Sequence, residues 1–298
     1  MAGDLPGAAR PAAIFLNRAS ASAGSRRIRR AIDLTRDALD ADLHVADTRQ
    51  PDELVGWMEE RIGGYRTVVV AGGDGTLAIA YNLAAGVQDL ELGYLPGGFG
   101  NATAHLLRLP RDPVALAAVV ARGETRPVDL VDANGRLALF AGLGWDALVA
   151  QRYAEGGARR LVGWAGAVGR SLPDLLQRQA VEVMADGEVI HAGPMELLVV
   201  STTPWYGRGL LVNPDARPDR GRLTARVYPG PLPRFALEAA RWFAHRRPGV
   251  PGVSVDEVVV RATDGQPLPV QADGDVIGRR PEWRFVVRPA AVRLIGRW

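Results

Sequence analysis

The sequence predicts an α/β protein in two parts, a doubly wound parallel-sheet domain followed by a mostly antiparallel β-sandwich. Up to about residue 123, short apolar strands alternate with helices, which is the pattern of a parallel sheet with crossover connections. From Arg126 onward, Asn-Gly and Asp-Gly hairpin signals replace the crossovers. We therefore expect one domain over residues 1–124 and a second over residues 125–298.

In the first domain we expect strands at 12–17, 43–46, 68–71 and 92–95. A helix is predicted at 51–62, because proline stands at its first position and two acidic residues follow in the first turn. Another is predicted at 113–122. The helix after the first strand begins with Arg26, Arg27, Arg29 and Arg30, a charge that favours anions or a solvated face.

In the second domain we expect hairpin turns at Asn134-Gly135 and Asp186-Gly187. Strands are predicted at 128–131, 137–141, 181–185, 189–191, 197–201, 223–228, 255–261, 269–272, 283–287 and 292–295. Two helical insertions are expected, at about 161–179 and at 232–245.

The composition is that of a globular protein, with 47% hydrophobic and 23% charged residues in a chain of 298. The sequence has no cysteine, no recognisable export signal and no apolar run of membrane-spanning length, so we expect a cytoplasmic protein. The formal charge of +3 suits anionic lipids or phosphates. Because there is no basic stripe, we expect no nucleic-acid partner.

The strongest functional signal is the turn Gly72-Gly73-Asp74-Gly75-Thr76, which follows a buried strand and opens a helix. Glycine turns at a helix N-terminus bring backbone amides close to a phosphate. A carboxylate would repel that phosphate unless a divalent cation lay between them, so Asp74 is a candidate ligand for Mg²⁺ or for its water shell. The alternative is that Asp74 only caps the helix.

A second glycine turn follows the next strand and contains Pro96, Gly98 and Asn101. Two such turns on neighbouring parallel strands are expected to converge. With both motifs, the chain resembles the diacylglycerol kinase catalytic family of lipid kinases, which includes sphingosine and ceramide kinases. The resemblance implies a two-lobed architecture whose last strand returns to the first lobe, ATP and Mg²⁺ as cofactors, and nucleotide-site roles for Gly72, Gly73, Asp74, Gly75, Thr76, Gly98 and Asn101. It also implies that Asn17 and Thr48 line the nucleotide site.

Another candidate is the turn Asp273-Gly274-Asp275. On the residues alone it is a hairpin turn. The family carries D-G-E at this place, so the resemblance implies that Asp273 lies near the metal and that Asp275 is the general base for the lipid hydroxyl. Aspartate is one methylene shorter than glutamate, so we expect either a closer backbone or an intervening water.

The chain departs from the family at two places that concern metals. Ala102 replaces an aspartate of the second motif, as in sphingosine kinases, which weakly favours a sphingoid or ceramide acceptor. Arg220 replaces the aspartate of a loop that holds a structural Mg²⁺ in bacterial diacylglycerol kinases. Asp219 is a substitute ligand one position earlier, but we expect a guanidinium to take the place of this cation.

Three further segments have two interpretations each. Residues 140–147 match the family's G-x-G-[FW]-D motif, in which the glycines pass under a lipid pocket, or else Trp145 is a core residue and Asp146 a helix cap. The segments 159–164 and 241–247 combine arginines with Trp164 and Trp242. They are expected either to dock on an anionic membrane surface or to pack under a solvated rim.

We therefore expect an ATP-dependent lipid kinase that acts at the inner face of the membrane, with diacylglycerol or a sphingoid or ceramide lipid as acceptor. One alternative is a small-molecule kinase related to NAD kinases. The other is a nucleotide- or lipid-binding protein of weak activity, suggested by Ala102 and Arg220. The oligomeric state stays open, with a homodimer among the alternatives.

Overall fold

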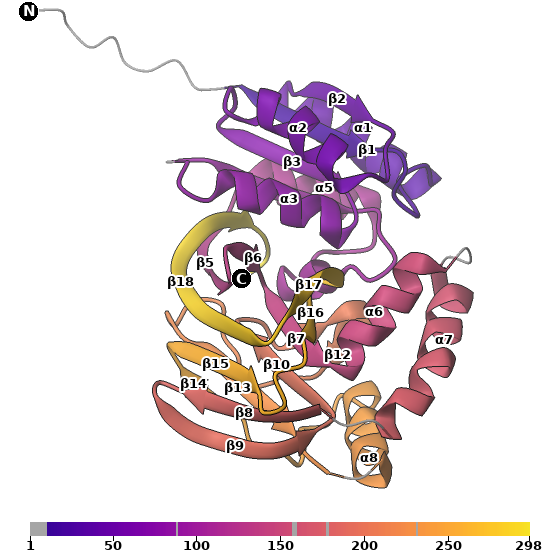
Figure 1. Cartoon of the computed structure of the whole chain (residues 1–298). Helices are drawn as coiled ribbons and strands as arrows, with labels where there is room; N and C mark the ends of the chain where they lie inside the picture. The colour runs from indigo at the N-terminus through magenta and orange to yellow at the C-terminus, as the bar shows by residue number, and fades with distance from the viewer. Residues whose placement is uncertain (1–10, 88, 157–159, 177–178, 231) are drawn as a thin grey trace, which may run out of the picture. The chain divides into compact units, whose positions relative to one another are not determined.

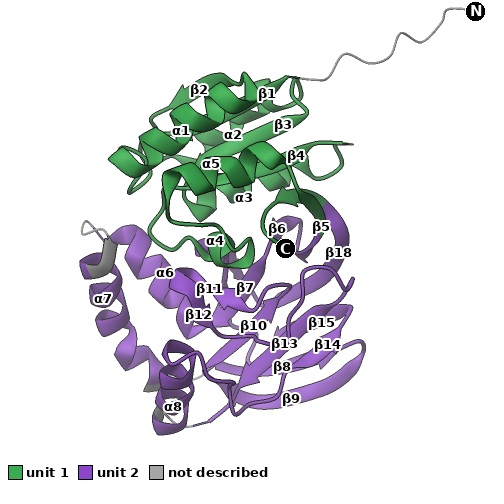
Figure 2. Cartoon of the chain, turned by 180° about the vertical axis from the view of Figure 1, so that it is seen from behind, with its two compact units in different colours: residues 1–127, 292–298 green, residues 128–291 purple. Residues whose placement is uncertain are grey.

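The computed structural model describes residues 11–87, 89–156, 160–176, 179–230 and 232–298, which form two compact units (Figure 1; Figure 2). The first unit comprises residues 1–127 and 292–298, and the second comprises residues 128–291. The chain passes from the first unit to the second within β5 (Thr125–Ala133) and returns within β18 (Glu282–Ile295).

The sheet of the first unit is parallel, as expected. Its strands stand in the order β2-β1-β3-β4, with bounds β1 (Ala12–Asn17), β2 (Asp42–Ala46), β3 (Thr67–Gly72) and β4 (Glu91–Pro96). The end of β18 adds a further parallel strand beside β4, where Arg293 pairs with Glu91. The glycine turns therefore follow two adjacent strands at the same edge of the sheet.

Helices cover both faces of this sheet, which makes it doubly wound (Figure 2). On one face, α1 (Arg26–Leu39) and α5 (Pro113–Arg122) pack over alternate strand residues such as Ile14 and Val69. Phe15 points the other way and contacts Trp57 of α2 (Pro51–Ile62), with ring centroids 5.3 Å apart. The remaining helices of the unit are α3 (Asp74–Ala84) and the short α4 (Ala102–Leu106).

The second unit is an antiparallel β-sandwich, which confirms the predicted fold class. One sheet has the order β14-β13-β10-β7-β16-β17, with bounds β7 (Phe140–Gly144), β10 (Leu197–Ser201), β13 (Leu223–Tyr228), β14 (Val253–Val255), β16 (Leu268–Ala272) and β17 (Asp275–Arg280). The other contains β8 (Gln179–Ala185), β9 (Glu188–Met195), β15 (Glu257–Ala262) and the first part of β18. Side chains of both sheets, among them Leu143, Val200, Trp283 and Phe285, form one core.

Both expected hairpins are present. Asn134-Gly135 joins β5 to β6 (Arg136–Ala138), and Asp186-Gly187 joins β8 to β9. A small two-stranded sheet, β11 (Trp205–Tyr206) and β12 (Leu210–Leu211), follows β10. The helices of the unit are α6 (Trp145–Glu155), α7 (Arg160–Ser171), a 3₁₀ turn at Leu172–Leu176, and α8 (Leu232–Phe243).

Several elements differ from the sequence prediction. Strands β11, β12 and β17 were not expected, and the strand expected at 137–141 is divided between β6 and β7. Helix α6 was expected only in the alternative that makes Asp146 a helix cap, because it buries only Ala147 and Val149 and so shows a weak apolar period. The two strands expected at 283–287 and 292–295 are one strand, β18, of 14 residues. Ala290 adopts a φ of 48°, and its amide is bound by the Asp129 carboxylate at 2.8 Å, so the chain bends there without leaving the strand.

Candidate active site

The two glycine turns of the first unit lie directly against each other. The amide of Gly97 donates to the carbonyl oxygen of Gly72 at 2.7 Å. A Cβ atom on Gly98 would lie only 2.6 Å from the Cα atom of Gly73, a distance that real side chains do not reach. Glycine is therefore required where the turns meet, and the expected convergence is present in the structure.

Asp74, the first residue of α3, has its carboxylate directed at the second motif. Its oxygens accept hydrogen bonds from the amides of Ala102 and Thr103, at 3.0 and 3.2 Å. Burial raises the pKa of this carboxyl, and the amide hydrogen bonds act in the opposite direction. The alternative that Asp74 caps its own helix is therefore wrong, because the cap residue of α3 is Gly73. The Asp74 carboxylate instead caps α4 by binding its first two amides.

Asn101 holds the second turn in shape. It adopts the left-handed conformation, with a φ of 46°. Its side-chain oxygen accepts from the Gly98 amide at 3.0 Å and from the Tyr94 hydroxyl at 3.1 Å, and its side-chain nitrogen donates to the Gly98 carbonyl at 3.0 Å. Tyr94, which sequence reasoning did not single out, also reaches Asp74 at 3.5 Å. The available signal was a tyrosine in a mostly apolar strand, where a buried hydroxyl needs a partner.

The first turn of α3 completes this part of the site. Thr76 is buried and occupies the space above Gly72, where a Cβ atom would lie 2.9 Å from the threonine hydroxyl oxygen. The amides of Gly75 and Thr76 belong to the first helical turn, which has no acceptor within an α-helix. This is the arrangement that binds a phosphate group.

Asn17 and Thr48 lie together beside a polar hollow of about 780 Å³, of which Thr48 is a lining residue. The side-chain nitrogen of Asn17 donates to the Thr48 carbonyl oxygen at 3.1 Å. The hollow is also lined by Arg18, Arg49 and Glu53, and the Thr48 hydroxyl donates to the last of these at 2.5 Å. The structure thus brings the two predicted nucleotide contacts together, but only Thr48 lines the hollow, and Asn17 is buried beside it.

Of the four arginines at the start of α1, one folds onto the second motif. Arg27 donates to the carbonyl oxygen of Pro96 at 2.9 Å, and its burial lowers the pKa of the guanidinium. Arg26, Arg29 and Arg30 are exposed, as the solvated alternative required. Only Arg27 therefore brings its charge to the glycine turns.

In the second unit, Asp273 and Gly274 form the hairpin turn between β16 and β17, with φ values of 50° and 93°. The Asp273 carboxylate accepts from the amides of Leu139 and Phe140 at 3.1 and 3.2 Å, so it ties the turn to the start of β7. Asp275, the first residue of β17, is exposed. Asp74 and the glycine turns lie in the first unit and this turn lies in the second. The contacts described for each lie within its own unit.

Asp146 belongs to a buried polar cluster that the sequence did not reveal. Its carboxylate fills the space beside Gly142, where a Cβ atom would lie 1.7 Å from an oxygen of Asp146. This oxygen accepts from the Tyr206 hydroxyl at 2.9 Å and from the Gln271 side-chain nitrogen at 2.9 Å. Burial raises the pKa of Asp146 to about 6. Gly142 thus makes room for a carboxylate, whereas Trp145 packs on the core formed with Tyr228 and Phe235.

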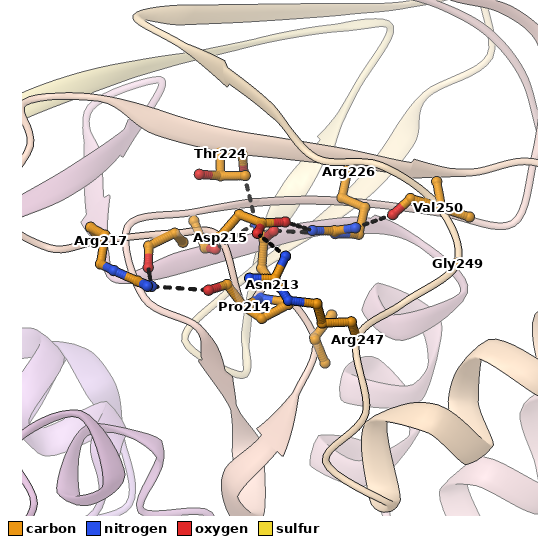
Figure 3. A network of polar contacts seen from close by, with 12 residues as sticks. Asn213, Pro214, Asp215, Arg217, Thr224, Arg226, Arg247, Gly249 and Val250 are labelled. Atoms are coloured by element: carbon orange, nitrogen blue, oxygen red, sulfur yellow. Dashed lines mark hydrogen bonds and ion pairs between the residues drawn. The ribbon is translucent and has the colours of Figure 1, made fainter.

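The loop over residues 213–222 is held by arginines, but not by the arginine that we expected (Figure 3). Arg220 is exposed. Arg217 instead donates to the carbonyl oxygens of Pro214 and Ala216, both at 2.9 Å. The buried Arg226 donates to Asp215 at 2.5 Å and to Asn213 at 3.2 Å. Guanidinium groups therefore occupy the carbonyl-rich loop and bind the Asp215 carboxylate, whereas Asp219 is exposed.

The tryptophan clusters divide into core and surface. Trp242 is only 6% exposed and donates from its ring nitrogen to the Tyr228 hydroxyl at 3.2 Å. Of the two alternatives, the packing one therefore holds for Trp242 and the membrane-facing one is wrong. Its neighbour Phe243 is 60% exposed and contacts the ring of Trp164, with centroids 6.5 Å apart. Arg159 lies outside the described residues.

Two family models together match nearly all of the described chain. The diacylglycerol kinase catalytic domain matches residues 11–133, and the YegS C-terminal NAD kinase beta sandwich-like domain matches residues 141–296. A Pseudomonas aeruginosa protein named "Probable lipid kinase YegS-like" is 29% identical over 280 residues, which is 91% of this chain and 90% of that protein. A protein of the same name from Pseudomonas putida is 28% identical and covers 79% of each chain.

Solved structures share the fold. The crystal structure of a diacylglycerol kinase from Bacillus anthracis superposes with a TM-score of 0.76, at 18% identity, over 97% of each chain. At that identity the likeness concerns the fold alone, whereas the two matched domains concern the family. The chain belongs to the family of lipid kinase-like proteins that combine a diacylglycerol kinase catalytic domain with a YegS-type C-terminal domain.

Proposed function

We propose that the protein transfers the γ-phosphoryl group of ATP to a hydroxyl group of a membrane lipid. The observation that supports this most is the contact of the two glycine turns beside the N-terminus of α3, with Asp74 at the same place. The helix amides and glycine backbones favour a phosphate. A carboxylate among them is compatible with that phosphate when a cation compensates its charge.

The residues of this place fit Mg²⁺. The Oδ2 atom of Asp74 accepts the Ala102 amide, which leaves a lone pair for a metal or for its water shell. Its Oδ1 atom accepts the Thr103 amide and is also reached by the Tyr94 hydroxyl at 3.5 Å. Mg²⁺ in kinases is held by one or two carboxylates together with phosphates and water. Among the described residues, no three His, Cys, Asp or Glu side chains form a metal cluster. When bound, Mg²⁺ would neutralise charge on the phosphates.

The nucleotide would lie over the first unit, with its phosphates at the glycine turns and its other end towards the hollow beside Thr48. Asn101 and Gly98 shape the phosphate side, because Asn101 fixes the turn that touches Gly73. Arg18 and Arg49 add positive charge at the rim of the hollow. Positioning and charge neutralisation account for most of the rate in such reactions.

Asp275 would take the proton of the acceptor hydroxyl. It is the carboxylate of the turn that is exposed, whereas Asp273 binds two backbone amides. A general base must reach the hydroxyl directly or through one water, and an exposed side chain at the start of a strand can do so. We therefore assign the structural role to Asp273 and the chemical role to Asp275.

A lipid acceptor needs a docking surface, and helices α7 and α8 offer one. Val162 on α7 is 76% exposed, and Leu237 and Phe243 on α8 are 54% and 60% exposed. The ring contact between Trp164 and Phe243 shows that the two helices lie side by side. Arg246 and Arg247 follow α8 and are exposed, which suits an anionic membrane surface. These exposed apolar and basic side chains support our proposal of peripheral binding at the inner face. No helix of the described residues is long and apolar enough to cross a bilayer.

The test is phosphorylation by radiolabelled ATP in mixed micelles that contain diacylglycerol, ceramide, sphingosine or monoacylglycerol. NAD is tested as a further acceptor, and a reaction without acceptor is the control. We expect one lipid to be labelled, and the label to depend on added Mg²⁺. Labelling of NAD instead would identify a small-molecule kinase. ATP binding without transfer to any acceptor would identify a binding protein of weak activity.

A further inference from the structure

We propose that Asp146 and Tyr206 are positioning residues for the turn Asp273-Gly274-Asp275 and that they act through the side-chain amide of Gln271. The inference rests on the proposed function only in giving Asp275 a part in the reaction. The contacts that carry it lie entirely within the second unit. None of the three side chains is among the residues that the proposed function assigns to the nucleotide.

The orientation of the Gln271 amide is fixed by its neighbours. Its nitrogen donates to Asp146 at 2.9 Å and to the hydroxyl oxygen of Tyr206 at 2.8 Å. The Tyr206 hydroxyl in turn donates a hydrogen bond to Asp146, at 2.9 Å. Two acceptors therefore face one end of the amide, and only its oxygen can point the other way. That oxygen accepts the amide of Gly274 at 2.8 Å.

The cluster is held rigidly against β7. Gln271 pairs with Gly142 in the sheet, and the missing side chain at Gly142 leaves the space that the Asp146 carboxylate fills. The ring of Tyr206 lies on that of Phe140, with centroids 4.1 Å apart. The second oxygen of Asp146 is buried without a hydrogen bond in the described part of the chain, so the carboxylate is kept at an energetic cost.

The turn is consequently held at two points. The Asp273 carboxylate accepts hydrogen bonds from the amides of Leu139 and Phe140, and the Gln271 side-chain oxygen accepts one from the amide of Gly274. The next residue is Asp275, which is exposed. A displacement of about 1 Å can reduce a transfer rate by about a hundredfold, so the support of an exposed turn matters for a base that it carries.

The turn Asn134-Gly135 provides a matched comparison within the same unit. Its φ values, 51° and 93°, are nearly those of Asp273 and Gly274, at 50° and 93°. The Gly135 amide also donates to a side chain three residues earlier, the Asp132 carboxylate, at 2.6 Å. Asp132 is held by Arg288 at 2.8 Å and not by the buried cluster. A substitution in the cluster should therefore weaken the hydrogen bond of the Gly274 amide and leave that of the Gly135 amide unchanged.

The experiment measures amide hydrogen exchange of Gly274 and Gly135 by NMR in the full chain. Asp146→Ala and Gln271→Leu should each accelerate exchange at Gly274 by about tenfold, the scale of one hydrogen bond, with Gly135 unchanged. The double variant should exchange no faster than Gln271→Leu. Asp146→Asn should resemble the wild type, because its side-chain oxygen can accept both hydrogen bonds.

Kinetics supply the second readout. Asp146→Ala should lower kcat with the KM for ATP unchanged, and Asp146→Asn should restore most of the loss. Tyr206→Phe, the mildest change, should accelerate exchange at Gly274 by about threefold. Unchanged exchange at Gly274 in folded Asp146→Ala and Tyr206→Phe would overturn the inference. If the wild type labels no acceptor, the proposed function fails, while the exchange rates still decide whether the cluster positions the turn.

Discussion

In the first unit the candidate site is made of backbone, whereas in the second it depends on side chains from distant parts of the chain. Gly73 and Gly98 meet because neither has a side chain, and the phosphate side is a helix N-terminus. In the second unit, Asp146 and Gln271 are hydrogen-bonded across a separation of 125 residues. We therefore expect the site in the first unit to lose its function when a glycine gains a side chain. We expect the site in the second unit to lose its function when a hydrogen-bonding side chain is removed.

The largest effect is expected for Gly98→Ala, which adds one methyl group where the turns touch. Its Cβ atom would lie 2.6 Å from the backbone of Gly73, so the turns must separate. We expect a loss of about 3 kcal/mol in the stability of the first unit, together with loss of ATP binding. Thermal unfolding and ATP titration measure both. Gly24→Ala is the control, because nothing lies within 4 Å of its added atom. Normal ATP binding by Gly98→Ala would show that the contact is dispensable.

Asp74→Asn tests the charge at the same place without adding volume. If this carboxylate anchors Mg²⁺, turnover at saturating Mg²⁺ should fall at least about a hundredfold, or about 2.7 kcal/mol, in a folded protein. Asp112→Asn is the matched control, because Asp112 also caps a helix of the first unit, accepting the Ala115 amide at 2.8 Å. Turnover within a few fold of the wild type would leave Asp74 as the cap of α4 alone.

Asp146→Asn tests whether the buried charge of Asp146 lowers the stability of the folded chain. Burial raises the pKa of Asp146 from 3.8 to about 6. The folded chain then binds the proton more tightly than the unfolded chain, so the contribution of this group falls as the pH rises between these values. The difference corresponds to about 3 kcal/mol.

Because asparagine carries no charge but leaves a buried donor, we expect Asp146→Asn to be more stable than the wild type by about 1–2 kcal/mol at pH 8. Near pH 4 the gain should vanish. Chemical unfolding of both proteins at pH 4, 6 and 8 measures it. A gain that is the same at every pH would mean that the charge of Asp146 is not its source.

The smallest effect concerns the surface of α7 and α8. Phe243→Ser should leave thermal stability near that of the wild type and weaken binding to anionic vesicles by about fivefold, roughly 1 kcal/mol. Val114→Ser, on α5, is the control, because Val114 is also exposed, at 58%. Equal weakening by both variants, or none by either, would move the docking surface away from α8.

The sequence was sufficient for the parts of the molecule that depend on local rules. Alternating strands and helices, proline at the start of α2, and the Asn134-Gly135 and Asp186-Gly187 turns each follow from neighbouring residues. The glycine turns were recognisable for the same reason. Their residues are consecutive, and adjacent parallel strands bring them to one edge.

What could not be predicted depends on contacts between distant residues. Nothing near Gln271 in the sequence indicates Tyr206 or Asp146, because the sandwich alone brings them together. Similarly, Trp242 and Phe243 are consecutive aromatic residues beside arginines, and only the packing of α8 buries one and exposes the other. Arg217 and Arg220 differ in the same way, since only the path of their loop decides which one meets its carbonyl oxygens.

The most direct test of the account is the lipid phosphorylation rate of Asp275→Asn, measured beside Asp275→Glu and Asp273→Asn. Removal of a placed base should lower kcat by about a hundredfold or more, with ATP affinity near normal because shape is preserved. Asp275→Glu should keep substantial activity, since it supplies the family's own residue. If Asp275→Asn stays active and Asp273→Asn does not, the two roles are reversed. If both variants stay active, the turn is only a hairpin and the account of proton transfer is wrong.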